Sequence, residues 1–415
     1  MTVSYMDMFR VFGRIGLLSF GGPAAQISLM HEELVSKRSW MRDEQFLGAL
    51  SFCMLLPGPE AMQLATFAGW RLRGVAGGLL AGLLFVLPGA CVIFALALGY
   101  AAYGEVPLVQ ALFLGVKAAV VAIVLQALMK LSQKALTGTD AWILAALAFV
   151  AMFFLQVPFP LVIACAAIWG ALRPAPAAPA PMEASQTPGM QRTLGVVAFW
   201  VVLWATPVAL AWAVGASFLV DVGLFFSKLA VVTFGGAYAV LAYMSQAVVE
   251  SYGWLNTQQM IDALGLAETT PGPLILVTQF VGVLAGSLSG GVTLAILAGM
   301  LTLWVTFVPC FLWIFAAAPY VDAILHKPRL KGALRAISAA VVGVILNLSI
   351  WFALHVLFGT VQDTGFGAVP VWSSLSGVSL GMVLISVGLL IFARVPMIPV
   401  LGIMAALGAA VSILI

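Results

Sequence analysis

The stretch FGRIGLLSFGGP, residues 12–23, decides the fold, because a related stretch, KLAVVTFGGAYAVL, occupies residues 228–241. Within them SFGG at 19–22 matches TFGG at 233–236 at an offset of 214 residues. A glycine pair inside an apolar run interrupts a helix, so each copy predicts a helix with a break in its middle.

The match continues along both copies. PGP at 57–59 matches PGP at 271–273 at the same offset, and downstream the offset changes. The further matches are Gly77-Gly78 with Gly290-Gly291 and Pro88 with Pro309. A register kept over this distance indicates a duplicated and fused chain.

Between the copies, residues 173–192 are dominated by Pro and Ala, which predicts an extended, solvated linker on the cytoplasmic side. The apolar stretch 193–221 has no counterpart in the first copy and predicts one extra transmembrane helix. We therefore expect a first repeat at 1–172 and a second at 222–415. One extra crossing would turn the second repeat upside down.

The basic residues test this inversion, because cytoplasmic loops are enriched in Lys and Arg. The loop after the first break carries Lys37, Arg38 and Arg42, whereas its counterpart carries Glu250 and no basic residue. Around residue 105 the first copy has only an acidic residue, and the equivalent loop carries His326, Lys327, Arg329 and Lys331. This exchange of charge predicts antiparallel halves, which are typical of secondary transporters.

The composition places the chain in a membrane. Hydrophobic residues make up 63% of the 415 residues and charged residues 8%, and the mean hydropathy is +1.14. Water cannot solvate a surface with so few charges, so lipid must cover it. Besides the broken segments, we expect spans at 74–102, 108–134, 140–156, 158–172, 194–220, 287–318, 334–358, 374–393 and 395–415. This order predicts a cytoplasmic N-terminus and a periplasmic C-terminus.

The Gly/Pro breaks shape the prediction for the fold. Basic residues flank both broken segments of the first half, which favours hairpins that enter and leave on one side. The fold class expected is an all-α polytopic membrane protein with two homologous halves as an inverted repeat, in which re-entrant broken helices meet near mid-membrane. Ordinary kinked spans remain the alternative. Either way, interrupted backbone within a membrane is tolerated only around protein or a cavity.

A helix that restarts at such a break points free N–H groups into the cavity, which suits a small oxyanion. The substrate-binding residues predicted at the breaks are Ser19, Gly21, Gly22, Pro23, Pro57, Gly58, Pro59, Thr233, Gly235, Gly236, Pro271, Gly272 and Pro273. Further neutral side chains could supply hydrogen bonds, but most are expected to satisfy interrupted backbone groups: Gln26, Gln63, Gln126, Thr269, Thr270, Thr278, Gln279 and Asn347.

Three cations are further candidates for substrate binding. Arg14 and Lys228 occupy equivalent positions before the glycine pairs, and Lys117 lies in an apolar run. Paired cations suit a tetrahedral dianion. The alternatives are interfacial topology markers for Arg14 and Lys228, and a snorkelling position near the outer end for Lys117.

Two carboxylates are candidates for coupling or gating. Glu60 follows Pro59 and Glu268 precedes Pro271, and acidic residues within apolar runs are usually functional. Glu60 is a candidate proton carrier. A first-turn helix charge for Glu60 and a position at the cavity lip for Glu268 remain alternatives.

Enzyme and cofactor chemistry lacks support in the sequence. The four cysteines lie in apolar runs without metal-ligand spacing, and no GxxxxGK[ST], HExxH or plausible Ser/His/Asp set occurs. We therefore expect no catalytic residue, no metal, no cofactor and no nucleic-acid partner. A homodimer stays open.

FGRIGLLSFGGP with LPGPE at 56–60, and the second copy with TTPGP at 269–273, resemble the chromate ion transporter (CHR) family, specifically its long-chain, two-domain members. The resemblance covers about 5–172 and 222–415 and carries over the Gly-Gly and Pro-Gly-Pro elements; the second copy has Ala237 in place of Pro23. It implies chromate export across the bacterial inner membrane and chromate resistance, with sulfate as a structural analogue.

Export of a dianion from a cell that is negative inside gains about 4.6 kcal/mol per 100 mV, so ATP is not required. Coupling to protons is a second energy source. A transporter of sulfate or an organic anion and a passive anion channel remain alternatives.

Overall fold

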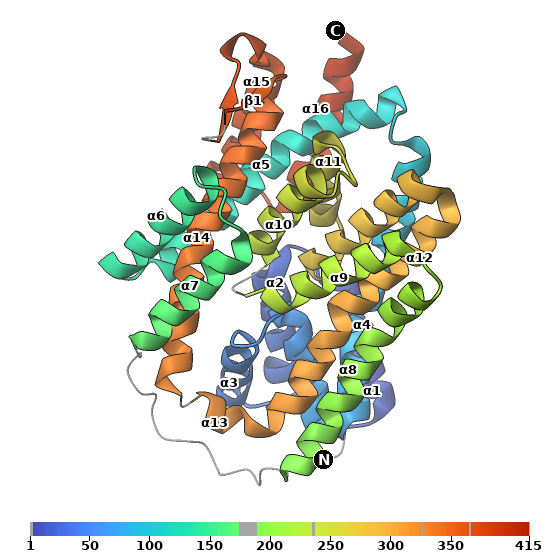
Figure 1. Ribbon diagram of the computed structural model, residues 1–415, viewed down its shortest axis with the longest axis vertical. Coiled ribbons are helices and arrows are strands. Elements are labelled where there is room, and N and C mark those ends of the chain that lie inside the picture. Colours follow the sequence, from blue (N-terminus) through green and yellow to red (C-terminus); the bar gives the residue numbers. More distant parts are fainter. Residues whose placement is uncertain (1–2, 174–188, 235–236, 326, 365–366, 415) are drawn as a thin grey trace. The chain divides into compact units, whose positions relative to one another are not determined.

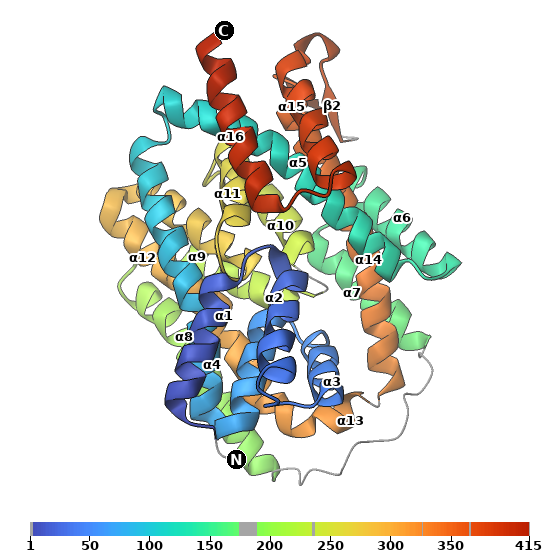
Figure 2. The ribbon, with the colours of Figure 1, turned by 180° about the vertical axis from the view of Figure 1, so that it is seen from behind.

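The computed structural model describes residues 3–173, 189–234, 237–325, 327–364 and 367–414 (Figures 1 and 2). The predicted break at Gly235-Gly236 and most of the predicted linker lie outside these residues. The first half contains α1 (Tyr5–Leu18), α2 (Gly22–His31), the π-helical η1 (Glu32–Ser36), α3 (Asp43–Cys53), α4 (Glu60–Tyr103), α5 (Pro107–Ala135), α6 (Thr139–Phe153) and α7 (Phe159–Leu172).

The second half adds a small antiparallel hairpin to its helices, which the all-α prediction did not include. Its elements are α8 (Met190–Ala213), α9 (Ser217–Val232), α10 (Ala237–Gln246), the π-helical η2 (Ala247–Ser251), α11 (Thr257–Thr269), the 3-10 turn η3 (Leu274–Leu276), α12 (Val277–Ala317), η4 (Ala318–Tyr320), α13 (Val321–Leu325), α14 (Pro328–Leu357), β1 (Val361–Asp363), β2 (Ala368–Pro370), η5 (Trp372–Ser374), α15 (Gly377–Val387), η6 (Gly388–Phe392) and α16 (Met397–Leu414).

Among the residues that the structure describes, five helices are long and apolar enough to cross a membrane, and shorter apolar helices cover the other predicted spans. The predicted span 194–220 is divided, because α8 ends at Ala213 and α9 begins at Ser217. Several apolar helices of this length are typical of a multi-pass membrane protein.

The chain forms two compact units, and each contains segments of both halves. Unit 1 consists of Met1–Leu98, Arg173–Ala237 and Thr270–Gly332, and there α8 and α9 lie against α12 (Figure 1). Unit 2 consists of Gly99–Leu172, Tyr238–Thr269 and Ala333–Ile415, and there α15 and α16 lie against α5 (Figure 2).

Equivalent segments of the two halves adopt the same local structures. A π-helical turn, which often marks a functional region, follows the broken helix in both: η1 after α2 and η2 after α10. Both long helices also contain one non-helical kink, at Arg73-Gly74 in α4 and at Gly290-Gly291 in α12, with nearly the same backbone angles.

These kinks correct one part of the sequence alignment. The sequence pairs Gly290-Gly291 with Gly77-Gly78, but the backbone pairs it with Arg73-Gly74. Three extra residues explain the difference, because η3 separates PGP from α12, whereas α4 begins directly after PGP at Glu60. Val277, the first residue of α12, is therefore the structural counterpart of Glu60.

Glycines let the helices of unit 1 approach closely. A Cβ built on Gly16 would lie 2.0 Å from the carbonyl oxygen of Leu84, so α1 packs directly on the α4 backbone. A Cβ on Gly89 would lie 2.2 Å from the carbonyl oxygen of Pro271, which places α4 against the PGP segment of the second half. Only a residue without a side chain fits at these two contacts.

Candidate functional site

The described breaks of the two halves are hydrogen-bonded to each other within unit 1. The Gly58 N–H donates to the carbonyl oxygen of Thr233 at 2.8 Å. The equivalent Gly272 N–H donates to the carbonyl oxygen of Ser19, also at 2.8 Å. The PGP segment of each half thus bonds the end of the first helix of the other half, and the two bonds are related by the repeat.

Backbone conformation explains the glycines at these positions. Gly21, Gly22, Gly58 and Gly272 have φ angles of 85°, 78°, 119° and 90°. Side chains disfavour this left-handed region, and glycine does not. After the break, α2 begins at Gly22 with Pro23 in its first turn, where a missing N–H costs nothing.

The hydroxyl groups of Ser19 and Thr233 serve their own helices. The Ser19 hydroxyl donates to Ile15 O at 2.5 Å, and the Thr233 hydroxyl donates to Leu229 O at 2.6 Å. Both side chains are buried. In this structure the two residues therefore use their backbone carbonyls, and not their hydroxyl protons, between the halves.

Gln26 joins the two breaks with its side-chain amide. Its Nε2 donates to Gly272 O at 2.7 Å and to Ser19 O at 3.3 Å. These two acceptors fix the amide orientation, because a flipped amide would bring three oxygens together. Its Oε1 is buried and has no hydrogen-bond partner among the described residues. An unpaired buried acceptor costs about 1–3 kcal/mol, so this oxygen is poised for a donor.

Gln63 likewise uses its side-chain amide to bond a backbone carbonyl, in the PGP segment of the first half. Its Nε2 donates to Pro57 O at 2.6 Å. The expectation that amide side chains near the breaks satisfy interrupted backbone is confirmed for Gln26 and Gln63.

A small pocket opens at these breaks. Residues from the broken segments of both halves line it: Pro23, Gln26, Pro59, Glu60, Ala61, Thr233, Ala237, Pro273, Leu274 and Ile275. The predicted site residues Pro23, Pro59, Glu60, Thr233 and Pro273 are thus brought together. Glu60, the first residue of α4, is the one ionisable residue among the described residues of this lining.

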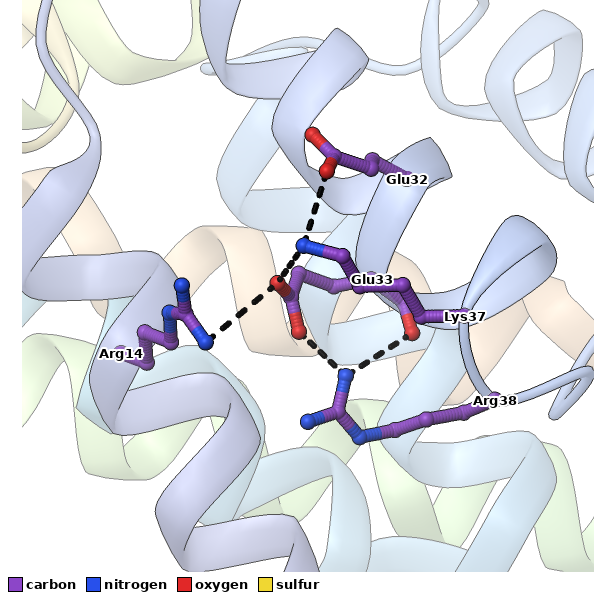
Figure 3. A network of polar contacts seen from close by, with 5 residues as sticks. All are labelled: Arg14, Glu32, Glu33, Lys37 and Arg38. Carbon is purple, nitrogen blue, oxygen red and sulfur yellow. Dashed lines mark hydrogen bonds and ion pairs between the residues drawn. The ribbon is translucent and has the colours of Figure 1, made fainter.

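The two predicted cations of unit 1 are not part of this lining. Lys228 is exposed on α9. Arg14 is 55% exposed, and its Nη1 lies 3.9 Å from Oε1 of Glu33 (Figure 3). The structure therefore does not bring this pair of cations to the pocket.

Glu33 is the centre of a cluster of charges that the sequence analysis did not identify. Its carboxylate is fully covered; Lys37 Nζ lies 3.0 Å from Oε1, Arg38 bonds Oε2, and Lys37 also pairs with Glu32 (Figure 3). Burial raises the pKa of Glu33, but the hydrogen bonds from Lys37 and Arg38 outweigh it and leave the pKa below its ordinary value. The bonds to Glu32 and Glu33 raise the pKa of Lys37.

Lys117 has an internal partner in unit 2. Its Nζ lies 3.1 Å from Oδ1 of Asp262 and donates to Gln258 Oε1 at 2.8 Å. The Tyr100 hydroxyl donates to Oδ2 of Asp262 at 2.6 Å. The partner of this half-buried lysine is thus the carboxylate of Asp262, which the sequence analysis did not identify.

Glu268 is also held by a tyrosine in unit 2. Its side chain is buried, and the Tyr238 hydroxyl donates to Oε1 at 3.0 Å. No group of three or more His, Cys, Asp or Glu side chains that could hold a metal occurs in the part of the chain that the structure describes.

Some of these partners carry a signal in the sequence. Glu33 precedes Lys37 by one helical turn, a spacing that predicts an ion pair. Asp262 is a carboxylate in a largely apolar segment and could have been singled out on that ground. The bridging role of Gln26 has no such signal, because its partner Gly272 is 246 positions away.

Comparisons with known proteins match both halves of the chain to one family. The chromate transporter family model matches residues 6–171 and again residues 220–410. A chromate transport protein of Pseudomonas aeruginosa is 32% identical over 349 residues, which cover 83% of this chain and 80% of that protein. A chromate transport protein of Cupriavidus metallidurans is 29% identical over 366 residues, covering 85% and 83%. A probable chromate transport protein of Synechococcus elongatus is 31% identical over 342 residues, covering 82% and 83%.

No solved structure matches this chain. The two family matches cover most of it, one on each half. The chain belongs to the chromate transporter family.

Proposed function

We propose that this protein is a secondary transporter that exports chromate across the bacterial inner membrane and so confers chromate resistance. The observation that carries the proposal is the pocket at the paired breaks, to which both halves contribute. Relatives whose matches cover more than 80% of this chain are named chromate transport proteins, and this supports chromate as the substrate. The protein acts as a transporter rather than as an enzyme.

The proposed architecture is an inverted repeat with re-entrant helices. Helices α1, α2 and α3 have 14, 10 and 11 residues, so none exceeds about 21 Å in length, against about 30 Å of hydrocarbon. Their lengths support hairpins rather than full spans. The exchange of basic residues between equivalent loops supports the inversion, with the N-terminus in the cytoplasm and the C-terminus in the periplasm.

In the proposed site, the anion binds in the pocket at the Gly-Gly and Pro-Gly-Pro segments. Helix α4 begins at Glu60, which lines the pocket, so the positive end of the helix dipole lies beside the pocket. Arg14 and Lys228 are proposed to attract the anion outside the pocket. Lys117 is proposed to contact it only when released from Asp262.

Export draws on the membrane potential, on proton coupling, or on both. The proposed proton carriers are Glu60, which lines the pocket, and Glu268, a buried carboxylate three residues before Pro271. Sulfate or another small anion as substrate is the near alternative. A passive anion channel is the second alternative. The backbone hydrogen bonds between the breaks of the two halves argue against a permanently open path.

The test is movement of radiolabelled chromate in proteoliposomes or everted vesicles, with sulfate as competitor, under an imposed potential. The expected result is saturable chromate flux that the potential drives. Sulfate flux without chromate flux would identify sulfate, and not chromate, as the substrate. Flux that never saturates would favour the passive channel. Folded protein that moves neither anion would overturn the proposed function.

A further inference from the structure

Five charged residues, here called the Glu33 cluster, gather beside the first Gly-Gly break: Arg14 on α1, Glu32 and Glu33 on η1, and Lys37 and Arg38 in the turn after η1 (Figure 3). The covered carboxylate of Glu33 holds the three cations together. Lys37 Nζ lies 3.0 Å and Arg14 Nη1 3.9 Å from Oε1, and Arg38 bonds Oε2. The cluster therefore joins the helical segments on both sides of the break.

The Glu33 cluster carries an excess of positive charge. Three cations face two carboxylates, which leaves one net positive charge, and no other carboxylate pairs with these cations in the part of the chain that the structure describes. Like charges this close repel each other, so the cations depend on the buried carboxylate to stay together. An anion that approaches from water meets a positive surface.

The cluster also keeps hydrogen-bond donors that Glu33 does not use. Arg14 makes no hydrogen bond with any described residue, and its side chain is 55% exposed. Arg38 uses only Nη1 for Glu33, and its side chain is 31% exposed. A guanidinium group binds two oxygens at once through its planar fork of N–H groups, so a tetrahedral oxyanion can use the remaining donors.

The second half lacks an equivalent of the Glu33 cluster. At an offset of 214 residues, the counterparts of the buried carboxylate and of the two cations in the turn are uncharged: Ala247, Ser251 and Tyr252. By the proposed topology, the cluster lies on the cytoplasmic side and the equivalent position of the second half lies on the periplasmic side. An anion is therefore held on one side only, which suits an exporter that loads inside and releases outside.

We propose that the Glu33 cluster is a capture site, at which the oxyanion binds Arg14 and Arg38 on the cytoplasmic side before it enters the pocket. The inference rests on the proposed function and adds a second binding site to it. Arg14 lies five residues before Ser19, about 8 Å along the axis of α1, so an anion held there is close to the break. Glu33 is a positioning residue, because it holds the guanidinium groups without touching the anion.

The test measures initial rates of chromate flux in everted vesicles, where the added chromate meets the cytoplasmic face. Arg14→Gln and Arg38→Gln are each expected to raise KM by about three- to tenfold and to retain the maximal rate, because a charge-assisted hydrogen bond is lost outside the pocket. The matched control is Arg10→Gln, which removes an exposed cation one turn earlier on α1 and is expected to keep the wild-type KM. An unchanged KM in the first two variants, or an equal rise in all three, would overturn the capture site.

Glu33→Gln separates positioning from charge. The loss of one negative charge by itself would lower the KM for chromate, because the net positive charge of the cluster grows. The loss of positioning raises KM, since the two guanidinium groups are no longer held together. A raised KM with a retained maximal rate is the expected result, and an unchanged or lowered KM would show that Glu33 does not position the cations.

Wild-type protein provides a measurement that does not depend on the folding of any variant. The KM for chromate is expected to be lower on the cytoplasmic face than on the opposite face, and to rise with ionic strength as the cluster is screened. Equal KM values on the two faces would overturn the proposal. Absence of chromate flux in folded wild-type protein would instead overturn the proposed function itself.

The phosphate group of an anionic lipid has the same tetrahedral oxyanion chemistry as the substrate. Wild-type protein and Arg14→Gln are therefore compared in vesicles of phosphatidylcholine alone and of phosphatidylcholine with phosphatidylglycerol. The difference in KM is expected in both kinds of vesicle, because the captured anion is the soluble one. A difference confined to the vesicles with phosphatidylglycerol would assign the cluster to lipid headgroups and overturn the capture of substrate.

Discussion

The contact between α4 and the second PGP segment gives the sharpest prediction about stability. A Cβ at Gly89 would lie 2.2 Å from Pro271 O and 2.7 Å from Cδ1 of Leu276. A relaxed carbon–oxygen contact needs about 3.3 Å or more, so Gly89→Ala must push the segment away by about 1 Å. The leucine can rotate, but the carbonyl belongs to the loop that bonds Ser19 through Gly272.

The magnitude follows from two terms. Overpacking of a buried contact costs about 1–3 kcal/mol, and a weakened bond between Gly272 and Ser19 adds about 0.5–1.5 kcal/mol. We therefore expect Gly89→Ala to lower the free energy of unfolding by about 2–4 kcal/mol. The thermal midpoint in detergent should fall by several degrees, and chromate flux should fall with it because the pocket is displaced.

The control is Gly99→Ala on the same helix, where nothing lies within 4 Å of the added Cβ. There the exchange should stabilise the helix slightly, by up to about 1 kcal/mol. Scanning fluorimetry and flux assays on both variants decide the matter. If Gly89→Ala is as stable and as active as Gly99→Ala, the inference that α4 packs directly on the Pro271 carbonyl is refuted.

Three further predictions concern the polar network. Gln26→Leu leaves the carbonyl of Gly272 without its amide donor and should lose about 1–3 kcal/mol of stability and most chromate flux; normal flux would show that the bridge is dispensable. The lowered pKa of Glu33 means that its contribution to stability is complete above the ordinary value of 4.5 and is lost as the pH falls through the lowered value. Glu33→Gln should therefore lower the thermal midpoint at neutral pH and flatten its dependence below pH 4.5; an unchanged profile would refute this. Asp262→Asn leaves Lys117 without its carboxylate and should cost about 3–5 kcal/mol, most of which the double variant with Lys117→Met should restore; no recovery would assign Asp262 a role beyond charge pairing.

The sequence alone determined the class of protein and its internal duplication. A chain with 8% charged residues can be solvated only by lipid, and recurring Gly-Gly and Pro-Gly-Pro elements interrupt helices wherever they occur. These are local properties, so they could be read without the fold. The family resemblance rested on the same elements and is confirmed by the family matches on both halves.

The pairing of side chains was decided only by tertiary structure. Gln26 reaches Gly272, and Lys117 reaches Asp262, across 246 and 145 positions of the chain. Such partners depend on how helices pack and not on periodicity. Arg14 was predicted to face the substrate from its position before the break, but the covered carboxylate of Glu33 lies beside it.

The register of the second half also required the structure. Sequence identity favoured the alignment of Gly290-Gly291 with Gly77-Gly78, because glycines match glycines. The backbone instead places the kink of α12 opposite Arg73-Gly74, since η3 inserts three residues after PGP. As a result Glu60 has the apolar Val277 as its counterpart. The duplicated halves thus supply one carboxyl group to the pocket, a difference set by where each helix begins.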